Sequence, residues 1–113
     1  MSMFHEFGLI DNFSYKNMKN YTKYTPEKYN CISVHDDYIQ PLCCKFMNIE
    51  TINPCIPERY NGLCYYGVTI IPTEACRKIM IILNNENNIA FNELKHLLET
   101  AVSSGKYIIH YGL

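Results

Sequence analysis

The run LCYYGVTII, from Leu63 to Ile71, constrains the fold more than any other part of the chain. Both of its alternating faces are largely apolar or aromatic, which is typical of a central strand that is covered on both sides. Gly67 adds no side chain to that packing and indicates a bulge or a close approach by another element. Pro72 ends the strand. The run therefore predicts a buried strand and not a site of chemistry.

Two other segments predict strands of the same sheet. The residues from Tyr29 to His35 alternate between two mixed faces. The segment from Tyr107 to Tyr111 is short and has an aromatic residue at each end, and we expect it to pair with Leu63–Ile71. Apolar residues that recur with helical spacing predict helices near residues 38–48, 74–83 and 92–104.

The boundaries of these helices follow from proline and from capping. Pro41 fits only the first turn of a helix, so we expect the first helix to begin properly at Gln40. Short polar side chains at a helix start accept from free backbone N–H groups, and acidic ones also interact favourably with the helix dipole. The expected boundary residues are Asp36 or Asp37, Thr73 and Asn92 at the starts and Gly105 at the last end.

The remaining segments carry weaker patterns. Residues 1–28 are rich in Lys, Asn and Tyr, and we expect a loop there with short pieces of strand or helix. Residues 50–62 hold two prolines and a glycine, which predicts a loop with at most one edge strand. A length of 113 residues suits one domain. The sequence therefore predicts a single α+β domain over residues 1–113, with a small, mainly antiparallel sheet packed against about three helices.

Charge and cysteine usage bear on the compartment and on the partners. The formal net charge is −1, so a broad electrostatic grip on nucleic acid or on an anionic membrane is not expected. No stretch approaches the ~18–20 apolar residues that span a bilayer, and the N-terminus lacks the basic start of a signal peptide. We expect a cytoplasmic protein whose six cysteines are reduced thiols in or near the core.

The sequence gives little support for a metal or a catalytic site. There is no CxxC or HxxxH spacing, and Cys31 and His35 would lie roughly 13 Å apart on a strand, too far to share one ion. Cys64 lies in the apolar run and is expected to be buried. His96 is expected on the surface or at the edge of the core. We expect no catalytic residue, no metal and no cofactor.

Two features suggest a binding surface. Before Tyr29, several tyrosines alternate with lysines and could stack on RNA bases, although the overall charge is not basic and the rim of a core is the simpler interpretation. From Tyr29 to Glu58 the chain carries four acidic residues against Lys45, a net charge of −3. Such an acidic face beside exposed tyrosines suits docking onto a basic protein.

Three segments, EKYNCISVHDDYI, GLCYYGVTIIPTEA and KYIIHYGL, resemble in order and spacing the small immunity proteins that are encoded beside bacterial polymorphic toxins. Contact-dependent growth inhibition systems are the best-known setting of that family. The resemblance covers about a third of the chain. Its motifs are strands and strand–helix junctions, so they report a shared fold more than a shared partner.

The resemblance implies a non-enzymatic cytoplasmic protein that binds the C-terminal toxin domain of a large secreted effector and blocks its active site or substrate access. Such toxins are frequently nucleases with basic surfaces, so an acidic patch would imitate nucleic acid and speed association. The charge pattern and the neighbouring aromatic anchors give the expected toxin contacts: Asp36, Asp37, Tyr38, Glu50, Glu58 and Tyr60.

Two other functions stay open at this point. One is a small cytosolic enzyme that uses a Cys or a His, and the other is an interaction domain that forms homo-oligomers through the exposed edges of its sheet. Arg59 lies among the expected contacts and interrupts their acidic character.

Overall fold

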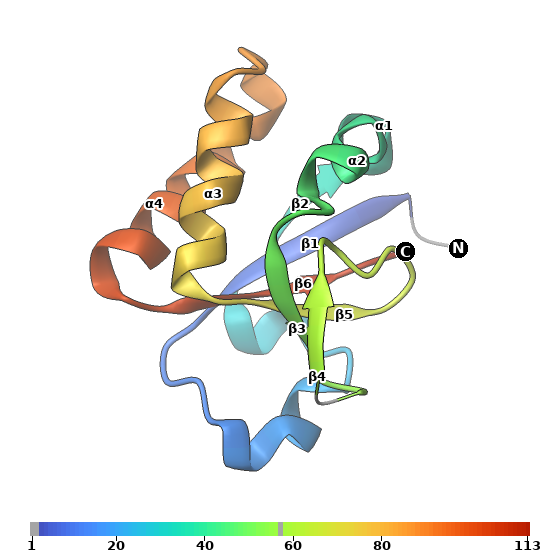
Figure 1. Ribbon diagram of the computed structural model, residues 1–113, viewed down its shortest axis with the longest axis vertical. Coiled ribbons are helices and arrows are strands. Elements are labelled where there is room, and N and C mark those ends of the chain that lie inside the picture. Colours follow the sequence, from blue (N-terminus) through green and yellow to red (C-terminus); the bar gives the residue numbers. More distant parts are fainter. Residues whose placement is uncertain (1–2, 57) are drawn as a thin grey trace.

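The computed structural model describes residues 3–56 and 58–113. Its centre is a six-stranded sheet with the order β2-β1-β6-β5-β3-β4, in which every neighbouring pair is antiparallel (Figure 1). The strands are β1 (Phe4–Ile10), β2 (Ile32–His35), β3 (Glu50–Asn53), β4 (Glu58–Asn61), β5 (Val68–Ile71) and β6 (Tyr107–Tyr111).

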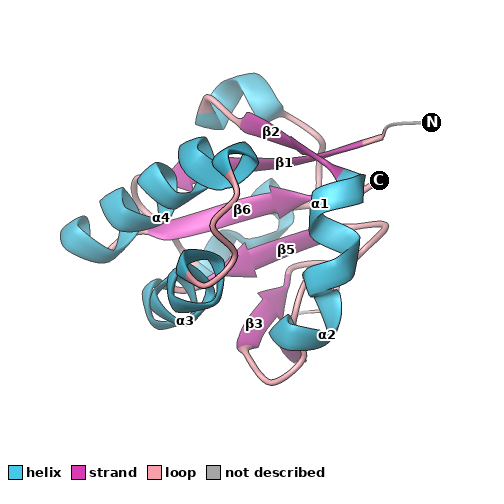
Figure 2. Cartoon of the chain, turned by 90° about the horizontal axis from the view of Figure 1, so that it is seen from above, coloured by secondary structure: helices cyan, strands magenta, loops and turns pink. Residues whose placement is uncertain are grey.

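Helices cover one face of this sheet (Figure 2). The α-helices are α1 (Asp36–Ile39), α2 (Cys43–Phe46), α3 (Thr73–Asn84) and α4 (Asn92–Ser104). Short 3-10 turns lie between β1 and β2 or connect the helices: η1 (Tyr15–Tyr21), η2 (Pro26–Tyr29), η3 (Gln40–Leu42) and η4 (Ile89–Phe91). The α+β class with an antiparallel sheet, expected from the sequence, is confirmed.

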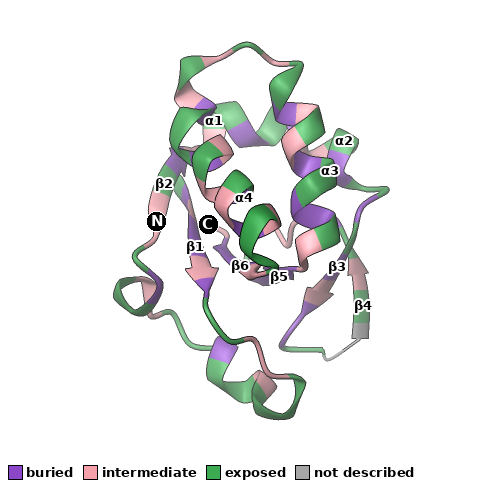
Figure 3. Ribbon diagram, turned by 90° about the vertical axis from the view of Figure 1, so that its left-hand side faces the viewer, coloured by how far each residue is buried: buried purple, intermediate pink, exposed green. Residues whose placement is uncertain are grey.

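Each face of the sheet has its own apolar cluster, because successive side chains of a strand point to opposite faces. On the helix-covered face, Ile71 and Ile108 pack with buried residues of α3 and α4. On the opposite face, Ile70 and Ile109 pack with residues of η1 and η2. Figure 3 shows buried positions concentrated in the middle strands. Each fully buried isoleucine stabilises the fold by about 1.5–3 kcal/mol.

Residues 1–28, for which we expected a loop with short pieces of strand or helix, contain a central strand of the sheet. β1 pairs with β2 on one side and with β6 on the other. Its sequence, FHEFGLI, places His5 and Glu6 where an apolar alternation would be expected, and these polar residues obscure the strand pattern. Gly8 is required by close packing, because a Cβ there would lie 2.5 Å from the Cβ of Tyr29.

The run Leu63–Ile71 is a strand only over its second half, so the longer prediction is wrong. β5 begins at Val68, and its predicted pairing with Tyr107–Tyr111 is confirmed. Residues 63–67 form a loop that lies along the end of β6, with Gly112 N–H donating to the Gly67 carbonyl at 2.7 Å. Residues 50–62 were expected to hold one edge strand at most, but they form the β3–β4 hairpin.

The helix predicted near residues 38–48 is broken in the middle. Pro41 lacks a backbone N–H, and the chain there takes the 3-10 turn η3 between α1 and α2. The two later helices are confirmed as α3 and α4, and Gly105 ends α4 with a positive φ of 67°. The expected strand from Tyr29 starts only at Ile32, since η2 and the left-handed Asn30 occupy its first residues.

The residues that we predicted to cap the N-termini of the helices do not do so in the structure. The ring nitrogen Nδ1 of His35 accepts the Asp37 N–H at 3.0 Å and caps α1, while Asp36 and Asp37 lie in the first turn. The hydroxyl of Thr73 donates to the Lys106 carbonyl instead of capping α3. Phe91, and not Asn92, occupies the N-cap position of α4.

Candidate functional site

The six expected toxin contacts form two separate groups in the fold. Asp36, Asp37 and Tyr38 follow the edge strand β2, whereas the other three belong to the β3–β4 hairpin at the opposite edge. Five strand spacings of about 4.8 Å separate the two edge strands, which is about 24 Å. The six residues therefore do not line one continuous acidic face.

Within the first group the two aspartates differ. The Asp37 side chain is 81% exposed and lies 3.6 Å from the ring of His35. Tyr38 is also exposed, and its ring stands edge-on against Phe91. The Asp36 carboxylate is only 18% exposed and accepts hydrogen bonds from inside the protein. Asp37 and Tyr38 are thus free to contact a partner, but Asp36 is not.

Within the second group the register separates the side chains. Glu50 pairs with Asn61 and Thr51 with Tyr60, so Glu50 and Tyr60 point to opposite faces of the hairpin. The exposed carboxylate of Glu50 forms an ion pair with Arg59, with 3.1 Å between Oε1 and Nε. Glu58 belongs to β4, and its side chain lies outside the described part of the structure.

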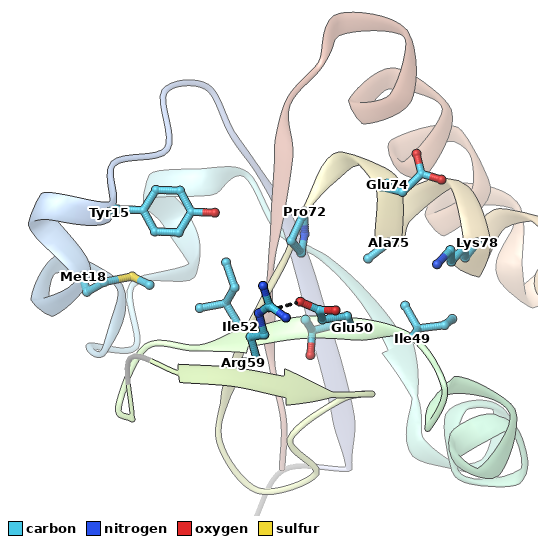
Figure 4. A pocket seen from close by; sticks show the side chains of 11 residues that line it. Tyr15, Met18, Ile49, Glu50, Ile52, Arg59, Pro72, Glu74, Ala75 and Lys78 are labelled. Atoms are coloured by element: carbon cyan, nitrogen blue, oxygen red, sulfur yellow. Dashed lines mark ion pairs between the residues drawn. The ribbon is translucent and has the colours of Figure 1, made fainter.

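A groove lies where β3 and β5 diverge. These strands share one bridge in the described chain, Ile52 with Ile70, after which Pro72 turns the chain into α3. The resulting hollow of about 560 Å³, which we name the β3–α3 groove, is lined among others by Tyr15, Met18, Glu50, Ile52, Arg59 and Lys78. Arg59 and Glu50 meet in its middle, with Tyr15 and Met18 towards one end and Lys78 towards the other (Figure 4).

The sequence pattern missed a buried polar network at the other end of the sheet. The rings of His5 and His110 stack with 5.1 Å between centroids, and both residues have 0% exposure. His5 Nδ1 lies 2.9 Å from His110 Nε2, and His5 Nε2 lies 2.8 Å from Asp36 Oδ1. The Tyr65 hydroxyl donates to both carboxylate oxygens of Asp36, at 2.6 and 2.5 Å. We name these four residues the histidine network.

The ionised carboxylate of Asp36 fixes the direction of the first hydrogen bond in this network, because a carboxylate only accepts and His5 Nε2–H must donate to it. When His5 is neutral, its Nδ1 is the acceptor and His110 Nε2–H is the donor. His110 Nδ1 then accepts from the Thr69 hydroxyl at 3.4 Å, and that oxygen accepts the Cys64 N–H at 2.7 Å. In this arrangement all donors of the hydrogen-bond chain point towards Asp36.

The surroundings act on the protonation of His110 and Asp36. Burial lowers the pKa of His110 well below its usual value of 6.5, and a positive charge on His5 would lower it further. For Asp36, burial raises the pKa, but the hydrogen bonds from Tyr65 and His5 more than offset this effect, so its pKa lies below 3.8. The Asp36 bond in turn raises the pKa of Tyr65 to about 12.

The two imidazoles of the network have no exposed surface. Four hollows of about 280 to 560 Å³ in the described chain are lined by other residues. Cys64 reaches it through a backbone N–H, not through its thiol. The hydrogen bonds of the network join β1, β6, α1 and the 63–67 loop.

Cysteines and possible metal ligands are dispersed. All six cysteines lie in the described chain and are free, but Cys44 and Cys55 are exposed and not near the core as expected. Burial raises the pKa of the Cys76 thiol to about 12. Over residues 3–56 and 58–113, no three His, Cys, Asp or Glu side chains are placed to hold one metal ion. His96 is exposed, as expected from the sequence.

Comparison with protein-family models, with curated proteins and with solved structures found no match to this chain. In the described part, no helix combines the length and the apolar character needed to cross a membrane.

Proposed function

We propose that this protein is a cytoplasmic immunity protein that binds a bacterial toxin domain, a nuclease in our expectation, and blocks its active site or substrate access. The family resemblance of the sequence motivates the class of function. The observation that carries the proposal in the structure is the β3–α3 groove beside an open sheet edge. This combination offers a partner both side-chain and main-chain contacts.

The groove has the composition of a protein interface. Tyr, Met and Arg are enriched in such interfaces, and the groove presents Tyr15, Met18 and Arg59 around the apolar side chain of Ile52. Tyr15 is 64% exposed, so its ring is available to a partner. Charges of both signs line the same hollow, which provides specificity more than raw affinity.

The edge strand β4 borders this groove. Among the described strands it pairs with β3 alone, so its outer N–H and C=O groups can take an added strand from a partner. Glu50, Tyr60 and the backbone of Glu58 from the expected contacts belong to this hairpin. We place the toxin here, and we place Asp37 and Tyr38 outside the main contact.

The direct test is neutralisation of the toxin domain encoded beside this gene. The toxin is expressed with and without this protein, and cell survival and nuclease activity are measured with equimolar purified proteins. We expect survival and loss of activity only when both are present. If the toxin remains fully active at saturating concentrations of this protein, the proposed function is wrong.

A charge swap locates the contact. Exchanging Glu50→Arg and Arg59→Glu together keeps their mutual ion pair but inverts the charges that a partner meets. We expect this double variant to weaken inhibition about ten-fold or more without changing the melting temperature. Glu99→Lys, on the exposed side of α4, is the matched control and should inhibit like the wild type. Inhibition that is unchanged by the swap would retain the function but move the contact away from the groove.

A further inference from the structure

At the end of the sheet where the histidine network lies, three pairs of consecutive residues each place one side chain on either side. His5, Tyr65 and His110 belong to that network. The residues that follow them, Glu6, Tyr66 and Tyr111, line a hollow of about 340 Å³ on the other side. Thr22, Tyr24, Val68 and Leu113 are among its other lining residues. We name this feature the aromatic hollow.

The aromatic hollow contains one carboxylate without a cationic partner. Glu6 is half-buried, and none of the ion pairs found among the described residues includes it. It accepts a hydrogen bond from the Tyr24 hydroxyl. That bond is the main cause that raises the pKa of Tyr24 to about 12, so the phenol remains a donor. The carboxyl group of Glu6 therefore lies among the tyrosine rings.

Those rings differ in exposure and orientation. Tyr111 is 3% exposed and forms the floor, Tyr24 stands edge-on to it at 5.0 Å between centroids, and Tyr66 is 78% exposed at the rim. A cation near the face of an aromatic ring is attracted by the ring's quadrupole. Three tyrosines around one carboxylate are thus complementary to a positive charge.

Two other polar groups of the hollow already have hydrogen-bond partners. The Gly67 carbonyl accepts from Gly112 N–H, and the Tyr111 hydroxyl donates to the Lys23 carbonyl and accepts from Thr25 N–H. A primary ammonium carries three donors that need acceptors. A quaternary ammonium has no N–H donor, so a wall made mainly of aromatic rings favours the quaternary form.

We propose that the aromatic hollow binds a quaternary ammonium group, with Glu6 as its counter-charge and the rings of Tyr24, Tyr66 and Tyr111 as its walls. This site lies apart from the β3–α3 groove and does not depend on the function proposed for it.

The test is a titration of the whole protein with choline, followed by the NMR signals of the tyrosine rings and by calorimetry. We expect saturable binding with a dissociation constant of about 1 mM or lower, the strength of two or three cation–π contacts. The neutral isostere 3,3-dimethylbutanol and ammonium ion should bind at least ten-fold more weakly. Equal binding of choline and its neutral isostere, or no binding of choline up to 50-fold above about 1 mM, would overturn the proposal.

Variants locate the site. Glu6→Gln removes the charge at nearly constant shape, and Tyr66→Ala removes the exposed ring, so each should weaken choline binding about ten-fold. Tyr66→Phe keeps the ring and should bind like the wild type. Tyr15→Ala removes a tyrosine elsewhere that is 64% exposed, against 78% for Tyr66, and is the control. Because Tyr66 is at the rim, its variant tests the site even if Glu6→Gln folds poorly, and unchanged binding in Tyr66→Ala contradicts the assignment.

Discussion

The two faces at one end of the sheet are built from neighbouring residues and yet have opposite properties. On the helix-covered face, α1 closes over the histidine network, and every strong donor there has its acceptor. On the other face, the covering segment is a set of 3-10 turns that leaves the aromatic hollow open. The alternation of a strand decides on which face of the sheet a residue lies. The layer that covers that face then decides whether a polar side chain forms hydrogen bonds inside the protein or is accessible to a ligand.

The largest expected effect is the loss of one imidazole from the closed side. His110→Ala leaves His5 Nδ1 without its donor and opens a cavity, so the free energy of unfolding should fall by about 2–4 kcal/mol in urea denaturation. Tyr66→Ala, on the open side, should change it by less than about 0.5 kcal/mol. Similar losses in both variants would remove the distinction between the two faces.

Acid should weaken the closed side next. The pKa of folded His110 is below 6.5, so between that lowered value and about 6.5 the unfolded chain binds more protons. The free energy of unfolding should therefore fall as the pH drops from 7 to 5, by at most about 1.4 kcal/mol per pH unit for this one proton. The lowered pKa of Asp36 adds a loss in the same direction, below about pH 3.8. His110→Gln should show a smaller slope from pH 7 to 5, and an unchanged slope would show that His110 is not its cause.

A smaller effect is expected when Tyr→Phe is made at residue 65 and, for comparison, at the adjacent residue 66. Tyr65→Phe removes the hydroxyl that donates to Asp36, so it should lower the melting temperature by a few degrees and raise the pKa of Asp36. The second effect is measured by NMR titration of the carboxyl carbons. Tyr66→Phe should leave both quantities as in the wild type. If the two variants behave alike, Tyr65 does not hold the carboxylate.

The smallest effect tests the charge on the open side. Burial, and then the charges of Glu6 and Glu27, raise the pKa of the Cys31 thiol to about 12. Glu6→Gln should lower that pKa slightly, and Cys31 should then react somewhat faster with iodoacetamide at pH 9, as followed by peptide mass spectrometry. The exposed Cys44 should react equally in both proteins. An unchanged rate at Cys31 would argue against a charged Glu6.

Local patterns predicted the parts of the fold that depend on local physics. The helical spacing of α3 and α4 and the apolar run at Val68–Ile71 lie within short windows, so periodicity alone indicates them. The sequence pattern did not predict the strand β1, because its two faces pack against segments that are distant in the sequence. Its His5 and Glu6 look like loop residues until the partners of both faces are known.

The candidate sites could not be predicted, because they depend on strand pairings between residues that are far apart in the sequence. His5 and His110 meet because β1 and β6 align Phe7 with His110, across 105 positions of sequence. The aspartate pair at residues 36 and 37 was noticed, but the pattern gave no sign that one carboxylate faces inwards. Counting charges along the chain also treated Glu50 as free, although the hairpin register brings Arg59 to it.

The position of β6 has a consequence for synthesis on the ribosome. This strand, the last of the sheet in chain order, lies between β1 and β5 and joins the β2–β1 pair to the β5–β3–β4 group. Before residues 107–111 are synthesised, the β2–β1 pair and the β5–β3–β4 group have no strand between them to join them. Topologies dominated by such distant contacts fold slowly, and unpaired inner edges can aggregate. Completion of this sheet therefore waits for the strand that is synthesised last among its six.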